Sequence, residues 1–239
     1  MLLIGAGGIG APAALALASD DRAGALELVV VDDDVVELSN LHRQILFGDS
    51  DVGRPKLRAL RAALAARAPE LAVRTIEGRV TPTTAAALVR DADVVLDACD
   101  NFATRFLAAD VAHLAGVPIV HAAAVRFHAT VLAISAAGRP CYRCLFEDLP
   151  TGDAPDCATA GVFGPVCGVA GAIGADLALR VLFGGHDPFA RVHTYDGARD
   201  RLRSVAVASR PGCALCGAGA NIVDVDASRY VLACDSGYE

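Results

Sequence analysis

The chain has 239 residues, of which 54% are hydrophobic and 21% charged, which provides a sizeable core and excludes the disordered class. The formal net charge of −7 excludes an overall basic surface for nucleic acid, so any polyanion must bind at a local site. We expect no transmembrane helix, because no run of about 18 apolar residues is free of glycine, proline and charge. No secretory signal precedes the first apolar segment, and we therefore expect a cytoplasmic protein.

Apolar runs and helical spacings predict strands and helices that alternate along the first part of the chain. The expected strands are residues 2–4, 26–31, 73–76, 93–98, 117–124 and 130–134. The expected helices are residues 12–18, 55–67, 83–90 and 102–115, the last of them closed by Gly116. This alternation predicts an α/β fold with a Rossmann-like, doubly wound and mainly parallel sheet.

The character of the chain changes after Ser135. Residues 136–165 are rich in Cys, Pro, Gly and Asp and indicate a loop, and a helix is expected over 166–183. Late strands at 192–196 and 202–208 are expected to extend the sheet in antiparallel fashion. We predict one domain over residues 1–217, followed by a C-terminal extension at 218–239.

A glycine-rich turn joins the first strand to the first helix and contains Gly5, Gly7, Gly8 and Gly10. Its backbone N–H groups and the helix N-terminus suit phosphate oxygens. Asp32 ends the second strand, where a carboxylate can accept hydrogen bonds from ribose hydroxyls. The pattern fits NAD, FAD, S-adenosylmethionine or ATP, and the alternative is a tight turn without a ligand.

Polar residues farther along the chain favour a triphosphate. Arg43 can grip phosphate through its guanidinium fork, and Lys56, the single lysine of the chain, can place a point charge on it. Asp100 and Asn101 follow the fourth strand, at the sheet edge where ligands bind in this fold class. A carboxylate there can hold Mg2+, a role that Asp97 could share, or it can cap the next helix.

Eight cysteines include two C-x2-C pairs, Cys141/Cys144 and Cys213/Cys216. Four thiolates suit a closed structural Zn2+ site, and the alternative is a pair of disulfides. We expect Arg143 and Arg210 to offset part of the net charge of −2 that four thiolates and Zn2+ would carry.

Three further cysteines differ in their surroundings. Cys157 lies in a Gly/Pro/Asp-rich loop and could be a nucleophile or sulfur carrier, although the adjacent Asp156 would tend to raise its pKa. Cys99 and Cys167 lie in apolar segments and are expected to be core residues.

Taken together, these motifs resemble the ThiF/MoeB/HesA family of ubiquitin-activating-enzyme-like adenylyltransferases, with ThiF and MoeB as the nearest branch. The matching segments are GAGGIG at 5–10, VVDDDVVELSNLHRQ at 30–44, GRPK at 53–56, LDACDN at 96–101, CYRC at 141–144 and DCATAGV at 156–162. They are joined by the pair Cys213/Cys216, and the resemblance covers residues 1–217.

The resemblance implies that ATP and Mg2+ activate the C-terminal glycine of a ubiquitin-like sulfur-carrier protein that ends in Gly-Gly. Asp32 would bind the ribose, Asn40, Arg43 and Lys56 the phosphates, and Asp100 the metal. A homodimer is implied, together with a sulfur donor such as a cysteine desulfurase or a rhodanese, which would convert the adenylate to a thiocarboxylate. Cys157 aligns with a loop cysteine that handles sulfur or acyl groups in some relatives.

Two other functions stay open. Relatives carry a helical segment with an arginine ahead of the first strand, whereas Met1 already lies in that strand, so we expect this arginine to be missing. A non-catalytic module that binds a ubiquitin-like partner is therefore one alternative. An NAD-dependent oxidoreductase is the other, although it leaves Arg43, Lys56 and the cysteine pairs unexplained.

Overall fold

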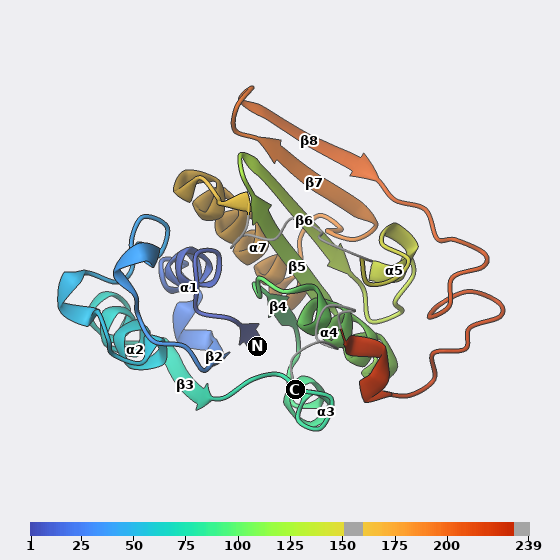
Figure 1. Cartoon of the computed structure of the whole chain (residues 1–239), viewed down its shortest axis with the longest axis horizontal. Helices are drawn as coiled ribbons and strands as arrows, with labels where there is room; N and C mark the ends of the chain where they lie inside the picture. The colour runs from blue at the N-terminus through green and yellow to red at the C-terminus, as the bar shows by residue number, and fades with distance from the viewer. Residues whose placement is uncertain (151–159, 232–239) are drawn as a thin grey trace, which may run out of the picture.

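The computed structural model describes residues 1–150 and 160–231. In these residues eight strands form one sheet, in the order β3-β2-β1-β4-β5-β6-β7-β8 (Figure 1). Strands β3 to β5 in this order run parallel, and the pairs β5–β6, β6–β7 and β7–β8 are antiparallel. The strands are β1 (Leu2–Ile4), β2 (Glu27–Asp32), β3 (Ala72–Glu77), β4 (Val95–Asp97), β5 (Ile119–Val125), β6 (His128–Ile134), β7 (Arg191–Asp196) and β8 (Arg201–Ala206).

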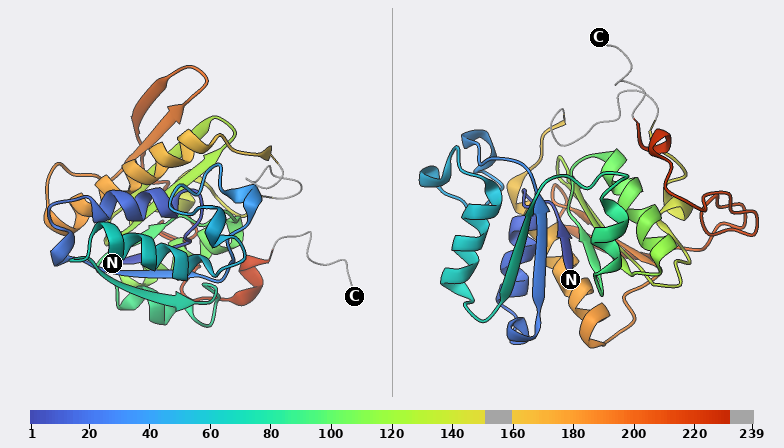
Figure 2. Two further views of the ribbon diagram at one scale, coloured as in Figure 1. Left: turned by 90° about the vertical axis from the view of Figure 1, so that its left-hand side faces the viewer. Right: turned by 90° about the horizontal axis from the view of Figure 1, so that it is seen from below.

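Helices cover both faces of the parallel part of the sheet (Figure 2). The α-helices are α1 (Gly10–Ala18), α2 (Lys56–Arg67), α3 (Ala85–Arg90), α4 (Phe102–Ala115), α5 (Tyr142–Leu145) and α7 (Gly164–Phe183). Short 3-10 helices occur at Ala23–Ala25, Leu38–Asn40, Asp49–Asp51 and Ala227–Tyr230. One apolar core lies under α1, α2 and α7, and a second lies under α3 and α4.

The predicted mainly parallel sheet with antiparallel late strands is confirmed. Helix α4 also begins and ends where the sequence predicts. The side chain of Asn101 accepts a hydrogen bond of 2.8 Å from the Thr104 N–H at its start, and Gly116 adopts a left-handed φ of 67° at its end. The first strand and helix also form as expected, although α1 begins at Gly10, before Pro12.

Helix α7 is a 20-residue apolar helix and is long and apolar enough to cross a membrane by length and composition alone. Half of its most apolar window is buried inside the protein, and it packs against α1, β5 and β6. Its contacts are those of a core helix.

The described residues after 217 return to the body of the protein. The Asn221 N–H donates to the Ala214 carbonyl at 2.9 Å, and the Tyr230 hydroxyl donates to Asp110 of α4 at 3.0 Å. The boundary at residue 217 stays a prediction.

Candidate functional site

A cavity of about 760 Å3 opens at the carboxyl ends of β1, β2 and β4, where the strand order reverses. In open α/β sheets this switch point is the place where ligands bind. The cavity is lined by most of the predicted nucleotide residues, namely Gly5, Gly7, Gly8, Asp32, Asn40, Arg43, Lys56, Asp100 and Asn101.

The glycine-rich turn has the backbone that this chemistry needs. Gly5 has a φ of +90°, which only glycine adopts without strain, and an added Cβ at Gly10 would overlap the Gly5 carbonyl oxygen. Gly10 therefore allows α1 to pack closely against the end of β1, and it is not among the residues that line the cavity. Within the described ranges the N–H groups of Gly7 and Gly8 have no protein acceptor, so they are available to phosphate oxygens.

Asp32 anchors the turn to the second strand. One carboxylate oxygen accepts from the Ala6 N–H at 2.7 Å, and the other accepts from the Asp34 N–H at 2.8 Å. Burial raises the pKa of Asp32 above its ordinary value, while these two backbone hydrogen bonds oppose the rise.

The two predicted phosphate-binding cations are held in place by neighbouring side chains. The Lys56 side chain is only 6% exposed, and its ammonium lies 2.7 Å from a carboxylate oxygen of Asp34, whose side chain is 55% exposed. The Arg43 guanidinium donates to the Asn40 side-chain oxygen at 2.6 Å. Arg43 carbon atoms lie 3.1 Å from a Cβ built on Gly8, so the arginine borders the turn directly.

The residues that follow β4 divide into two environments. Asp100 is exposed, and among residues 1–150 and 160–231 its carboxylate has no hydrogen-bond or salt-bridge partner. One free carboxylate beside a phosphate pocket suits Mg2+. Asp97, which could have shared this role, is fully buried. It accepts a hydrogen bond of 2.7 Å from His121 and lies 3.4 Å from the Arg105 guanidinium.

This buried group keeps the carboxylate of Asp97 ionised. Burial alone would raise the pKa of Asp97, but Arg105 and the His121 hydrogen bond hold it at about 2. Burial lowers the pKa of His121, so the ring is neutral and Nδ1 donates to Asp97. The other ring nitrogen, Nε2, is buried and has no hydrogen-bond partner among residues 1–150 and 160–231.

The cavity is also lined by residues that the sequence did not single out, among them Arg79, Gln44 and His121. Arg79 follows β3 and donates to Asp33 at 2.6 Å, so the rule that ligands meet strand carboxyl ends would have found it. Gln44 adjoins Arg43 in the same predicted motif. His121 lies inside β5, and no local pattern distinguishes it from a core histidine.

The four predicted zinc ligands meet in a second place, outside the cavity. The sulfur atoms of Cys141, Cys144, Cys213 and Cys216 all lie within 4.8 Å of one another and are buried. Roughly 2.3 Å zinc–sulfur bonds in a tetrahedron place the sulfur atoms about 3.8 Å apart. The observed separations of 3.4 Å for Cys141–Cys213 and Cys144–Cys216, and 3.9 Å for Cys141–Cys144, fit this arrangement. All four are free cysteines in the part of the chain that the structure describes.

The expected compensation by arginine side chains is wrong in its geometry. Arg143 points away from the cysteines and forms two hydrogen bonds of 2.9 Å with the buried carboxylate of Asp110. The Arg210 guanidinium contacts Glu147. It is the backbone N–H of Arg210 that donates to the Cys144 sulfur, at 3.3 Å. Both guanidinium groups therefore have acidic partners, and the contact that Arg210 makes with a cysteine sulfur comes from its backbone.

The remaining cysteine predictions have mixed outcomes. Cys99 and Cys167 are buried as expected, and both also line the cavity. Cys157 lies outside the described residues, so its suggested role in sulfur or acyl handling stays a prediction.

Comparison with known proteins identifies the class to which this fold and site belong. The ThiF family matches residues 1–215, and the chain belongs to that family.

Two curated relatives match nearly the full chain. The SAMP-activating enzyme E1 of Haloferax volcanii is 42% identical over 98% of this chain and 86% of that protein. The sulfur carrier protein ThiS adenylyltransferase of Escherichia coli is 39% identical over 91% of this chain and 85% of that protein.

A solved structure supports the fold alone. E. coli MccB with ATP superimposes with a TM-score of 0.77 at 22% identity. The match covers 90% of this chain and 66% of that one.

Proposed function

We propose that the protein adenylylates the C-terminal glycine of a ubiquitin-like sulfur-carrier protein and so prepares it for thiocarboxylation. The observation that carries this proposal is a cavity that brings together the glycine turn, the fixed cations Arg43 and Lys56, and the Asp100 carboxylate. Within residues 1–150 and 160–231 neither the N–H groups of Gly7 and Gly8 nor the Asp100 carboxylate has a hydrogen-bond partner. The names of the Haloferax and E. coli relatives, which describe an activating enzyme and a carrier adenylyltransferase, support it.

The reaction needs positioning and charge neutralisation, and no general base, because the nucleophile is already a carboxylate. A carboxylate oxygen of the carrier glycine bonds to the α-phosphorus of ATP. The bond from that phosphorus to the bridging oxygen breaks, and pyrophosphate leaves with the electron pair. Arg43 and Lys56 would neutralise charge on the phosphates, and Asp32 would bind the ribose.

The surroundings of the cations favour this role. Asp34 and Asn40 already hold Lys56 and Arg43, so little reorganisation is needed when ATP binds. Asp100, with Asn101 beside it, would hold Mg2+, which would supply positive charge that neutralises the phosphates. Zn2+ held by the four cysteines would be structural, because a closed site of four thiolates offers no open position for substrate.

The finer assignments form part of the same proposal. They are a homodimer, a sulfur donor such as a cysteine desulfurase or a rhodanese, and a cytoplasmic location. Four free thiols arranged for zinc are typical of a reducing compartment, which supports the last of these.

The test is ATP–pyrophosphate exchange with a Gly-Gly-ended carrier from the same genome and Mg2+. We expect exchange that requires the carrier and is lost in Lys56→Ala and Asp100→Ala. Carrier binding without exchange would instead identify a non-catalytic binding module. Calorimetry in which NAD binds in preference to ATP would revive the oxidoreductase alternative.

A further inference from the structure

The antiparallel part of the sheet has one face that continues from the cavity to the sheet edge. Alternate residues of a strand share a face, and the strand register aligns them in rows. One row runs from Val125 through His128 and Asp196 to Arg201. The next row runs from Ala123 through Thr130 and Thr194 to Arg203. The opposite face of these strands is covered by helix α7, which packs against β5, β6 and β7. That face contributes Ala122, Ala124, Val131 and Tyr195 to the apolar core.

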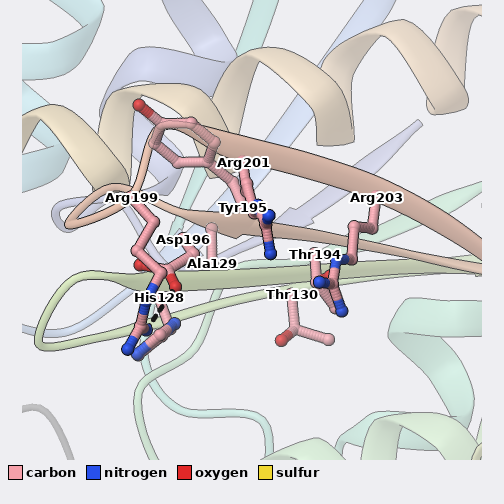
Figure 3. Close-up of a pocket in the computed structure, with 9 residues that line it drawn as sticks. All are labelled: His128, Ala129, Thr130, Thr194, Tyr195, Asp196, Arg199, Arg201 and Arg203. Atoms are coloured by element: carbon pink, nitrogen blue, oxygen red, sulfur yellow. Dashed lines mark hydrogen bonds and ion pairs between the residues drawn. The ribbon is translucent and has the colours of Figure 1, made fainter.

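This face carries a local positive charge on an acidic protein. We call His128, Thr130, Thr194, Arg199, Arg201 and Arg203 the arginine face. Figure 3 shows the labelled arginines and His128 on the same side of the β7–β8 hairpin, with Tyr195 on the other side. Arg199 is paired with Asp196 at 2.9 Å. Arg201 and Arg203 have no acidic partner within ion-pair distance in the described part of the chain.

The arginine face is hollowed and joins the candidate active site. It forms a pocket of about 490 Å3, and His128 and Thr130 line both this pocket and the larger cavity. Arg201 and Arg203 lie on β8, two strands beyond β6, which corresponds to roughly 10 Å from these shared residues. A protein whose tail entered the cavity past His128 and Thr130 would have its folded body beside the arginine face.

We propose that the arginine face docks the folded body of the carrier through acidic side chains on that body while the carrier tail occupies the cavity. This proposal rests on the proposed function. It adds that named arginines help to determine which carrier the protein accepts. Complementary charge at such a rim mainly raises the association rate and discriminates between partners. A nucleic acid fits less well. Among the described residues only Arg201 and Arg203 of this face are arginines without an ion pair, and the chain as a whole is acidic with a net charge of −7.

The test uses R201E/R203E in full-length, zinc-loaded protein, with R201Q/R203Q as a milder pair. We expect the carrier KM in pyrophosphate exchange to rise roughly tenfold or more, and the ATP KM to stay unchanged. The difference should shrink at high salt, because exposed charges are screened. The matched control is R58E/R61E, which reverses two exposed arginines on α2 and should leave both constants unchanged. A carrier KM equal to that of the wild type in both arginine-face variants would overturn the proposal.

A second measurement separates this proposal from the proposed function. Calorimetry measures the binding of a carrier from which the Gly-Gly tail has been deleted. This carrier cannot be adenylylated, so its binding does not depend on the adenylylation reaction. If wild-type protein gives no exchange, the adenylylation proposal fails. Tighter binding of the tail-less body to wild type than to R201E/R203E would still support docking. Equal binding of the tail-less body to wild type and to R201E/R203E would overturn docking. Docking would also be overturned if R201E/R203E lost binding to a short duplex DNA but still bound the carrier as the wild type does.

Discussion

Replacing Arg143 with alanine removes the guanidinium that neutralises Asp110 in the protein interior. Arg143 and Asp110 side chains are 2% and 0% exposed and are joined by two hydrogen bonds of 2.9 Å. After the substitution the Tyr230 hydroxyl is the one side-chain donor to Asp110 that remains among the described residues, so most of the carboxylate charge stays buried and uncompensated. Breaking a buried ion pair from one side costs about 3–5 kcal/mol of unfolding free energy.

The assay is urea unfolding of zinc-loaded protein at neutral pH, with a thermal scan beside it. For a chain of this size the same loss lowers the Tm by roughly 6–20 °C. Arg199→Ala is the matched control, since its ion pair with Asp196 is exposed and contributes about 1 kcal/mol or less. Arg143→Met combined with Asp110→Leu should recover part of the loss. A loss from Arg143→Ala no greater than that from Arg199→Ala would refute the reasoning.

Three further outcomes follow from the site. Lys56→Ala should lower kcat for pyrophosphate exchange by about a hundred- to a thousandfold, with Lys56→Arg in between, and steady-state kinetics that gave a near-wild-type rate would contradict this. The folded-state pKa of His121 is below its ordinary 6.5, so the unfolded chain binds the proton first and stability should fall as the pH drops below about 6.5. His121→Gln should flatten that slope in urea unfolding, and an unchanged slope would count against the assignment. Atomic absorption should find about one zinc per chain, and Cys213→Ser should lower both zinc content and Tm, whereas full zinc in this variant would exclude the four-cysteine site.

Local sequence patterns predicted the parts of the fold that depend on neighbouring residues. The glycine turn after β1 follows from backbone conformation, as the φ of +90° at Gly5 illustrates. The end of α4 at Gly116 follows from the same preference. The cysteine cluster was also predictable, because thiolates at C-x2-C spacing have few uses in one chain.

Long-range pairing was not predictable in this way. The partners of Asp97 lie on α4 and β5, and no local pattern around Asp97 indicates that Arg105 and His121 will contact it. Arg143 lies between two predicted zinc ligands in sequence, yet its side chain contacts Asp110 of α4. The arginine face arises because β6, β7 and β8 align residues that are far apart along the chain.

The central claim is tested most directly by following the α-phosphorus of ATP. Carrier protein, enzyme and Mg2+ are incubated with ATP labelled at either the α- or the γ-phosphate, and the acid-precipitated carrier is counted. We predict that the α-label appears on the carrier, that the γ-label is released as pyrophosphate, and that deletion of the terminal glycine abolishes the transfer. Transfer of the γ-label, or no transfer to any Gly-Gly-ended carrier of the genome, would contradict the account.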